Sequence, residues 1–398
     1  MSWLRIPLAI VGGYLIGSIS TAYWVARWRA GIDIREHGDG NAGTVNVSKV
    51  LGLKAGLVVA VVDLSKGLVA YAVARWMGLN LWVAYAAGFA AIVGHIAPFY
   101  LGFRGGQGAA TATGLLLYSL GQCLWRGWLP LGDLAFLAWV VAVFGWISLK
   151  GEVIACAVLP LLAAELILRL PANPVTRAAA LLALFLLGVS LTNLFHRKVL
   201  VLRREVREGI KWGRFGLRPA AMAFPAAEQW LGSRTGVGLV TAVTLAALAG
   251  DALRLARRSV ASAAWSRIRV ILKDKEAYRF SSISLFLLAC TITLVVFPLP
   301  IAWLALLYLI FGDMCGKFFG LQYGRHPFFH KTVEGTLACF AACTIVSFWV
   351  APAVGVPFAV AVAGAFGATA AEALPLGVDD NLSMSLVSGA TMYGLLYL

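Results

Sequence analysis

Several groups of polar residues interrupt an otherwise apolar chain, and their residue types are those that handle phosphate. The densest group, residues 312–336, combines five glycines with one Asp, one Glu, one Arg, two His and two Lys. Glycines let backbone amides approach an anion closely, and Lys and Arg neutralise phosphate. Asp and Glu are the usual protein ligands of Mg²⁺ beside substrate phosphates. This island therefore predicts a place where a nucleotide or a phosphorylated substrate meets a lipid.

Three further polar islands lie in the first half of the chain, at residues 33–49, 94–111 and 193–197. His95 and His196 are candidates for proton transfer or phosphate contact. Asn41 and Asn46 can orient a hydroxyl group, and Lys49 adds a positive charge. The residues expected to bind a substrate phosphate are Gly38, Gly40, Gly43, Arg104, Gly105 and Gly106.

The composition excludes an ordinary soluble protein. The 398 residues are 61% hydrophobic and 13% charged, whereas a soluble chain carries about 25% charged residues. Apolar stretches of about 18 residues recur along the chain, which predicts an all-α, polytopic integral membrane protein. The formal net charge of +15 indicates basic cytoplasmic loops facing anionic membrane lipids. No recognised nucleic-acid-binding module accompanies this charge, so we expect no nucleic-acid partner. The six cysteines have no CxxC spacing and are interpreted as reduced thiols.

The first half is predicted to be a seven-helix domain over residues 1–195. The expected spans are 5–26, 53–77, 82–100, 109–121, 131–148, 152–170 and 177–195. Basic residues concentrate in the loop after the first span and in the segment after the seventh. These segments should be cytoplasmic. The N-terminus is then expected outside the cell, and the polar islands on the cytoplasmic side of the cell membrane.

A basic, proline-containing segment, residues 196–235, is predicted to be a cytoplasmic linker. A second domain, residues 236–398, should form a bundle of five to six helices. Its expected spans are 236–253, 280–297, 300–312, 333–350, 353–372 and 382–398. Basic segments on both sides of 236–253 are inconsistent with a single crossing there. This helix either pairs with a short helix near 219–232 or lies at the membrane interface.

Residues 1 to about 210 resemble the PlsY-type acyl-phosphate:glycerol-3-phosphate acyltransferases, which are integral membrane enzymes. The matching elements include Gly17-Ser18-Ile19, Asp33-Ile34-Arg35, Gly40-Asn41, Asn46-Val47, Asp63 with Lys66-Gly67, Gly94-His95, Gly105-Gly106 and His196-Arg197. The resemblance implies seven spans and acyl transfer from acyl phosphate to the 1-hydroxyl of glycerol 3-phosphate, giving lysophosphatidate. It implies no metal or other cofactor. Catalytic roles would fall to His95, His196, Asn41, Asn46 and Lys49.

Four positions depart from the family pattern. Asp39 stands where the family has Ser, and Lys49 replaces an Arg, which loses the bidentate fork. Gln107 replaces a Lys, and Val199 replaces an Asn. Losing one oriented stabilising group costs roughly 100- to 1,000-fold in rate. The first half is therefore either an active acyltransferase or a binding domain that has lost its activity.

The second half resembles CTP-using lipid enzymes: dolichol kinase, phytol kinase, diacylglycerol kinase and, more distantly, phosphatidate cytidylyltransferase. The matching residues are Gly312-Asp313, Gly316, Gly320, Tyr323-Gly324-Arg325, Lys331-Thr332, Glu334-Gly335-Thr336, Glu372 and Asp379-Asp380-Asn381, with Glu276, Arg279 and Ser281-Ser282 upstream. The resemblance implies phosphoryl transfer from CTP to a lipid alcohol. Such transfer depends on positioning and charge neutralisation.

Roles follow from the side-chain chemistry. Asp313, Glu334 and Asp380 are the candidate Mg²⁺ ligands, and Lys331 and Arg325 would neutralise the triphosphate. The nucleotide site is expected to comprise Asp313, Gly316, Gly320, Arg325, Lys331, Glu334, Glu372, Asp380 and Asn381. Glu372 would orient the attacking hydroxyl or pair with a cation. An alternative outside the enzymes is a transporter or scaffold for phosphorylated lipids. A transporter would show inverted repeats and helices broken at the midplane, and the sequence shows no such symmetry.

Overall fold

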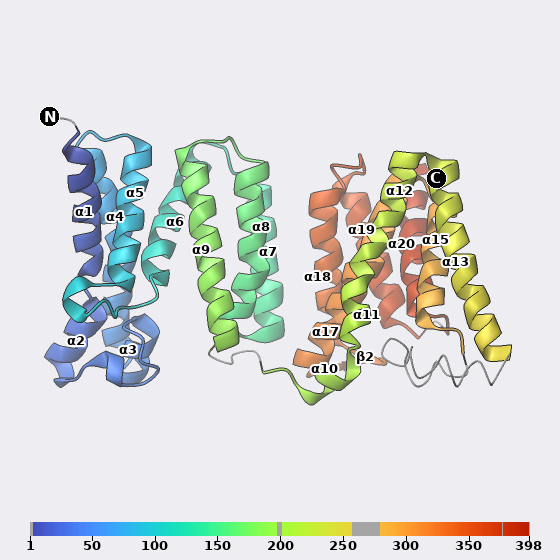
Figure 1. Cartoon of the computed structure of the whole chain (residues 1–398), viewed down its shortest axis with the longest axis horizontal. Helices are drawn as coiled ribbons and strands as arrows, with labels where there is room; N and C mark the ends of the chain where they lie inside the picture. The colour runs from blue at the N-terminus through green and yellow to red at the C-terminus, as the bar shows by residue number, and fades with distance from the viewer. Residues whose placement is uncertain (1–2, 197–200, 257–278, 376, 398) are drawn as a thin grey trace. The chain divides into compact units, whose positions relative to one another are not determined.

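The structure, a computed structural model, describes residues 3–196, 201–256, 279–375 and 377–397. The chain forms two compact units that divide close to residue 200, and each is described by itself (Figure 1). Nearly all of the regular structure is helical. Within the described ranges, nine helical segments are long and apolar enough to cross a membrane. The protein is therefore an all-α, multi-pass integral membrane protein, as the sequence predicted.

A helix occupies each of the seven predicted spans of the first unit. The helices are α1 (Arg5–Ser18) with α2 (Thr21–Ala30), α4 (Leu53–Trp76), α5 (Leu81–Ile96), α6 (Ala109–Trp125), α7 (Leu131–Ser148), α8 (Gly151–Leu168) and α9 (Pro174–His196). The first span is broken after Ser18, and α2 continues it at an angle (Figure 1). Short helices α3 (Thr44–Leu51) and η1 (Ile34–Glu36) lie in the first polar island, and η2 (Phe99–Leu101) lies in the second.

Glycines bring α1 and α5 into backbone contact. A Cβ atom on Gly13 or Gly17 would collide with the carbonyl oxygens of Ala87 and Ala91, and one on Gly94 would collide with that of Tyr14. Small residues at such positions let membrane helices approach closely where no hydrophobic effect drives them together. This contact fixes the end of α5, where His95 lies.

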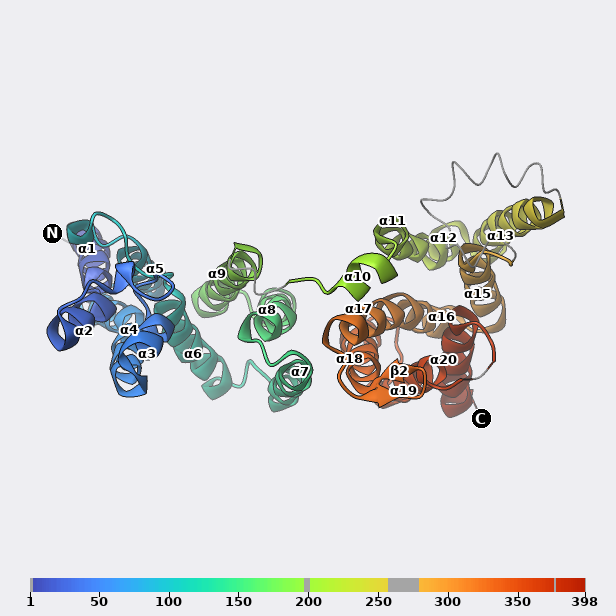
Figure 2. The same ribbon diagram turned by 90° about the horizontal axis from the view of Figure 1, so that it is seen from below.

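The second unit contains the remaining helices and a short hairpin (Figure 2). They are α10 (Arg204–Gly209), α11 (Trp212–Leu217), η3 (Arg218–Met222), α12 (Ala223–Leu231), α13 (Ser233–Ala256), α15 (Ser282–Val296), α16 (Leu299–Leu307), the π-turn η5 (Tyr308–Gly312), α17 (Asp313–Tyr323), β1 (Pro327–Phe328), β2 (Lys331–Thr332), α18 (Val333–Val350), α19 (Phe358–Ala373) and α20 (Asp380–Tyr397). Its core is separate from that of the first unit and is centred on Leu304, Tyr308 and Ile310, which are fully buried.

The segment predicted to be a linker packs within the second unit from residue 201 onward. Gln322 accepts a hydrogen bond from the Arg203 amide at 3.1 Å and donates one to the Val201 carbonyl at 2.9 Å. Of the two predicted paths for helix 236–253, the structure has the pairing with a short preceding helix. α13 packs on α12, and Gly236 lies directly against the backbone of Glu228.

The polar island at 312–336 begins inside a helix and not in a loop. The helix that starts at Leu299 continues through the π-turn and α17 to Tyr323. Gly316 and Gly320 lie on the face of α17 that packs on α18, next to Cys339 and Thr332. No proline interrupts the segment, and the spacing of four residues puts these glycines on one helix face. The predicted span, 300–312, ended too early, because glycines in this pattern are compatible with a loop as well as with a packed helix face.

Candidate functional site

The first unit holds a polar cavity of about 580 Å³ that collects side chains from all three of its polar islands. Its lining residues are Asp39, Asn41, Gly43, Thr44, Val45, Lys49, Asp63, His95, Gln107, Gly108, Ala109, Ala110, Glu152 and Asn193. The predicted gathering of the islands at one end of the bundle is thus observed. Of the predicted site residues, Asn41, Gly43, Lys49 and His95 line the cavity.

Two helix N-termini open onto this cavity. Gly43 caps α3, and Gly108 caps α6 in the left-handed conformation. The first-turn residues of both helices line the cavity wall. The first amides of a helix have no intrahelical acceptor and carry a partial positive charge, so a helix N-terminus favours an anion. The cavity thus offers two such termini and the Lys49 ammonium group.

Four of the five glycines that were predicted to bind the substrate phosphate use their backbone amides within the protein. The amides of Gly105 and Gly106 donate to the carbonyls of Ile96 and His95 at 2.9 and 3.1 Å. The amides of Gly40 and Gly43 are likewise bonded within their own loop. Neither Gly38 nor Gly40 lines the cavity, and the same holds for Gly105 and Gly106. These glycines are required for close packing: a Cβ on Gly106 would collide with the His95 ring.

Asn46 holds the first polar loop together and does not face the cavity. Its side chain is fully buried. The Nδ2 group donates to the carbonyl oxygens of Ile34 at 3.1 Å, His37 at 2.9 Å and Asn41 at 3.0 Å. Its Oδ1 accepts from the Asp39 amide at 3.0 Å. The prediction that Asn46 orients a substrate hydroxyl is therefore replaced by a role in shaping the loop.

A cluster of three buried ionisable side chains lies at the cavity, and two of them, Asp63 and His95, line it. Asp63 Oδ1 accepts a 2.5 Å hydrogen bond from Lys66 Nζ and lies 3.8 Å from His95 Nδ1. All three side chains are buried. Within the described residues, neither His95 Nδ1 nor the second oxygen of Asp63 has a hydrogen-bond partner. His95 is therefore placed to exchange a proton with a molecule in the cavity.

Residues that the sequence analysis treated as departures occupy the cavity rim. The amide groups of Gln107 and Asn193 bond to each other at 2.7 and 3.1 Å. The Asp39 carboxylate accepts the Asn41 amide at 3.1 Å. Glu152, at the start of α8, lines the cavity and was not predicted. Its signal in the sequence is a single charge at a helix start, which pattern analysis does not separate from an ordinary surface charge. Val199 and Arg197 lie outside the described residues.

Arg104 and His196 lie outside the cavity, and both are exposed. The backbone carbonyl of Arg104 accepts a hydrogen bond at 3.4 Å from Arg35, which forms an ion pair with Asp33 in the first loop. The hydrogen bonds from the Arg35 guanidinium group lower the pKa of Asp33, and the same bonds raise the pKa of Arg35. Arg35 also donates to the Leu101 carbonyl at 2.8 Å. This pair therefore ties the first polar loop to the second.

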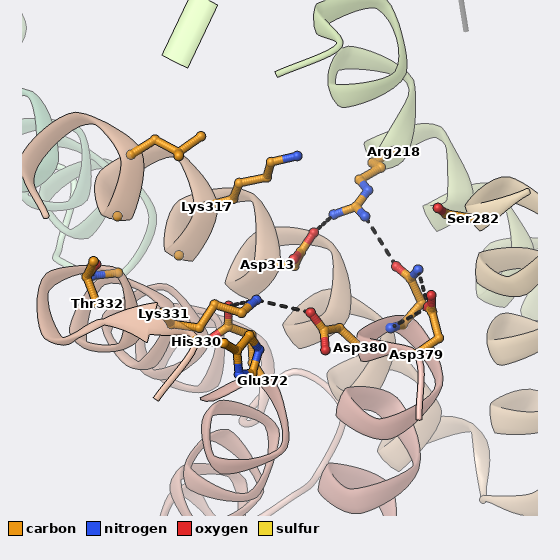
Figure 3. A pocket seen from close by; sticks show the side chains of 15 residues that line it. Arg218, Ser282, Asp313, Lys317, His330, Lys331, Thr332, Glu372, Asp379 and Asp380 are labelled. Carbon is orange, nitrogen blue, oxygen red and sulfur yellow. Dashed lines mark hydrogen bonds and ion pairs between the residues drawn. The ribbon is translucent and has the colours of Figure 1, made fainter. Parts of the chain in front are cut away.

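The second unit contains its own polar cavity, of about 500 Å³ (Figure 3). Its lining residues are Arg218, Ser282, Asp313, Gly316, Lys317, Gly320, Leu321, His330, Lys331, Thr332, Gly335, Glu372, Asp379, Asp380 and Asn381. Seven of the nine residues predicted for a nucleotide site are among them. They come from α17, β2, α19 and α20, which are distant in sequence.

Lys331 joins two carboxylates across this cavity. Its Nζ donates to Glu372 Oε1 at 2.7 Å and to Asp380 Oδ2 at 3.0 Å (Figure 3). Burial alone would lower the pKa of Lys331, but the two carboxylates outweigh it and the pKa is raised. Glu372 is 2% exposed, and within the described residues its Oε2 has no hydrogen-bond partner. The predicted pairing of Glu372 with a cation is thus observed, with Lys331 as that cation.

Arg325 and Glu334 do not belong to this cavity. The Glu334 carboxylate accepts bonds from the Arg325 amide at 3.0 Å, from Arg325 Nε at 3.1 Å and from the His326 ring at 2.8 Å. Glu334 is fully buried and shapes the turn before β1. The prediction that Glu334 binds Mg²⁺ and Arg325 binds the triphosphate is not supported by this geometry. Gly316 and Gly320 line the cavity, but their amides lie within α17.

Of the predicted Mg²⁺ ligands, Asp313 and Asp380 remain at the cavity. Among the described residues, no three His, Cys, Asp or Glu side chains are grouped closely enough to hold a metal ion. A cavity residue that the sequence missed is Arg218, which was assigned to the linker. It bonds Asp313 and, at 3.2 Å, Asn381 Oδ1. Nothing in the local sequence separates Arg218 from its basic neighbours.

Fold and cavity together define the first unit as a membrane-embedded helical bundle with a polar cavity at one end, lined by two helix N-termini, Lys49 and His95. The glycerol-3-phosphate acyltransferase family model matches residues 7–200. A glycerol-3-phosphate acyltransferase of Synechococcus sp. (strain JA-2-3B'a(2-13)) is 37% identical over 207 residues, which are 52% of this chain and 96% of that protein. The chain therefore belongs to the glycerol-3-phosphate acyltransferase family through its first half.

Other relatives match shorter stretches. Glycerol-3-phosphate acyltransferase 4 of Dehalococcoides mccartyi (strain CBDB1) is 48% identical over 110 residues, which are 28% of this chain and 47% of that protein. Among solved structures, the integral membrane glycerol 3-phosphate acyltransferase PlsY in its glycerol 3-phosphate form is 25% identical. That similarity covers 48% of this chain and 93% of the other, with a TM-score of 0.37.

Proposed function

We propose that the first unit transfers an acyl group from acyl phosphate to glycerol 3-phosphate, with its cavity facing the cytoplasm. The 1-hydroxyl oxygen bonds to the acyl carbonyl carbon, the bond from that carbon to the phosphate oxygen breaks, and inorganic phosphate leaves. The hydroxyl proton passes to a base. The products are lysophosphatidate and phosphate, and no metal or other cofactor takes part in this step.

One observation carries the proposal: a single cavity is lined by two helix N-termini, Lys49 and His95. The helix termini and Lys49 suit the phosphate of glycerol 3-phosphate. His95, with Nδ1 unpartnered among the described residues, suits the transferred proton. The family membership and the name of the Synechococcus relative support the same reaction.

The test is to supply the purified full-length protein with acyl phosphate and glycerol 3-phosphate and to measure lysophosphatidate. Lys49→Gln is expected to raise KM for glycerol 3-phosphate about tenfold or more, since a charge-assisted hydrogen bond is lost. Lys54→Gln, the same change at an exposed position five residues on, is the matched control. Absence of lysophosphatidate from the intact protein would refute the proposal and leave the first unit as a phosphate-binding domain.

We infer a second, separate activity for the second unit: CTP-dependent phosphorylation of a lipid alcohol. The lipid hydroxyl oxygen attacks the terminal phosphorus of CTP, CDP leaves, and the proton passes to a carboxylate. The observation that favours this candidate is the cavity of the second unit, which holds three cations and four carboxylates. Seven of the nine residues that the sequence predicted for a nucleotide site line this cavity, and Arg325 and Glu334 do not.

Mg²⁺ suits this site because carboxylate oxygens are its preferred donors, and one or two of them are enough when substrate phosphates supply the rest. Asp313 and Asp380 would hold it. The bound cation would neutralise charge on the transferred phosphoryl group. Lys331 holds Glu372 and Asp380 in place on the cavity wall.

The assay supplies labelled CTP and Mg²⁺ with diacylglycerol, dolichol or phytol and measures the phosphorylated lipid. Asp313→Asn is expected to reduce the rate by 100-fold or more. Glu334→Gln perturbs the turn outside the cavity. We therefore expect it to lower the stability of the protein and not to act on the transfer step itself. Full activity in Asp313→Asn, or no labelled lipid from the intact protein, would refute the kinase proposal.

A further inference from the structure

Arg218 reaches the cavity of the second unit from a segment that belongs to none of its motifs. It lies at the junction of α11 and η3, where the helix tightens before Pro219. Its guanidinium group bonds Asp313 and Asn381 and lies 5.8 Å from the centre of the Phe286 ring. Figure 3 shows the side chain pointing from this junction toward α17. The side chain is 15% exposed and the Asp313 side chain 12%.

Five of the charged side chains lining the cavity are joined to one another in ion pairs. Asp313 is paired with Arg218, while Glu372 and Asp380 share Lys331. The cavity therefore contains the cations that a polyphosphate needs and the carboxylates that a divalent cation needs, but they neutralise each other. Among the described residues no three His, Cys, Asp or Glu side chains are grouped closely enough to hold a metal ion, so a divalent cation here would also need oxygens from the phosphate-bearing ligand.

One carboxylate oxygen of this cavity is buried without a partner among the described residues. Glu372 Oε2 is buried at the cavity wall without a hydrogen-bond partner in the described structure. Leaving a buried charged oxygen unsatisfied costs free energy, and native proteins rarely do so without a use for it. A bound cation with its water shell would satisfy this oxygen.

We propose that Arg218 is an anion-binding residue of this cavity, whose guanidinium group is bonded to Asp313 in this structure. When a phosphate-bearing ligand and a divalent cation enter, the guanidinium group turns to phosphate oxygens and the cation takes its place on Asp313. The segment 201–231 thus contributes to the site and is not a passive connection. This inference rests on the proposed second function for its ligand class, but it concerns binding and not turnover.

The exchange predicts opposite effects of one substitution on two ligands. Arg218→Gln removes a cation that competes for Asp313, so Mn²⁺ alone should bind roughly tenfold more tightly. The same change removes a phosphate contact, so pyrophosphate in the absence of divalent cations should bind roughly tenfold more weakly. Arg218→Lys keeps the charge but loses the fork, and should leave Mn²⁺ affinity near wild type.

The measurements are electron paramagnetic resonance of free Mn²⁺ and calorimetry with pyrophosphate, on the full-length protein in detergent. Adding Asp313→Asn to Arg218→Gln should return Mn²⁺ affinity to the wild-type level. Arg204→Gln, at an 82% exposed arginine of the same unit, is the matched control and should change neither affinity. If Arg218→Gln weakened both ligands or left both unchanged, Arg218 would only position Asp313, and the exchange would be refuted. These binding results stand whether or not the lipid kinase assay gives product.

Discussion

Replacing Asn46 by Ala tests whether this residue shapes the first polar loop or takes part in the reaction. The substitution leaves the carbonyls of Ile34, His37 and Asn41 and the amide of Asp39 without their partner. A buried polar group left unsatisfied costs about 1–3 kcal/mol. Since three of these four bonds lie in partly exposed surroundings, water replaces part of the loss. We therefore take the low end of that range, about 3–4 kcal/mol in all.

A destabilisation of this size raises the open population of the loop by a factor of roughly 100 or more. The assay is hydrogen–deuterium exchange of a peptide covering residues 34–43, measured beside acyltransferase kinetics. We expect the exchange of this peptide to rise and KM for glycerol 3-phosphate to increase, because Asn41, Gly43 and the start of α3 form the cavity wall.

Asn80→Ala is the matched control. Asn80 is exposed and its side chain accepts a single hydrogen bond, from the Val83 amide at the start of α5. Its loss should cost about 1 kcal/mol and leave the 34–43 peptide unchanged. A fall in kcat for Asn46→Ala with unaltered exchange would show that Asn46 acts in the reaction, and the structural role would be wrong.

Three further outcomes are expected. Gly17→Ala should lower the melting temperature in detergent by several degrees, because a Cβ there collides with the α5 backbone. Gly12 has open space around it, so Gly12→Ala should leave the melting temperature unchanged. Equal melting temperatures of the two variants would contradict the close α1–α5 packing. Gln107→Lys should lower KM for glycerol 3-phosphate several-fold by adding a cation at the cavity rim, and a raised KM would show that its pairing with Asn193 matters more. Because bonding to Arg35 lowers the pKa of Asp33, its contribution to stability is present above the ordinary Asp pKa of 3.8 and is lost as pH falls through the lowered value. Asp33→Asn should remove this acid-dependent component of the unfolding curve, and an unchanged pH dependence would exclude the pair as its source.

The membrane helices could be predicted because the property that defines them is local. A run of about 20 apolar residues is required to cross a bilayer wherever it occurs in a chain, so α4, α7 and α9 were placed correctly from composition. The predicted helix boundaries were wrong where glycine can serve either a loop or the packing of two helices. In α17 the glycines serve helix packing and not a loop, and sequence spacing alone is compatible with either.

Residue types and motif order predicted phosphate chemistry for both halves. They could not assign individual side chains, because a carboxylate or an amide serves the loop or the cavity according to which atoms surround it. Asn46 and Glu334 turned inward to backbone amides and carbonyls, whereas Lys331 and Glu372 met across the cavity.

Arg218 shows most clearly what could not be predicted from the sequence. Its position within a basic segment indicated an exposed cytoplasmic residue, and only the tertiary structure brings it to Asp313, 95 residues further along the chain. The sequence by itself determined a membrane protein of many apolar helices, and it predicted phosphate-handling residues in each half. The tertiary structure decided which of those residues share a cavity, because that depends on helix packing and chain path between positions whose separation in sequence carries no information about distance.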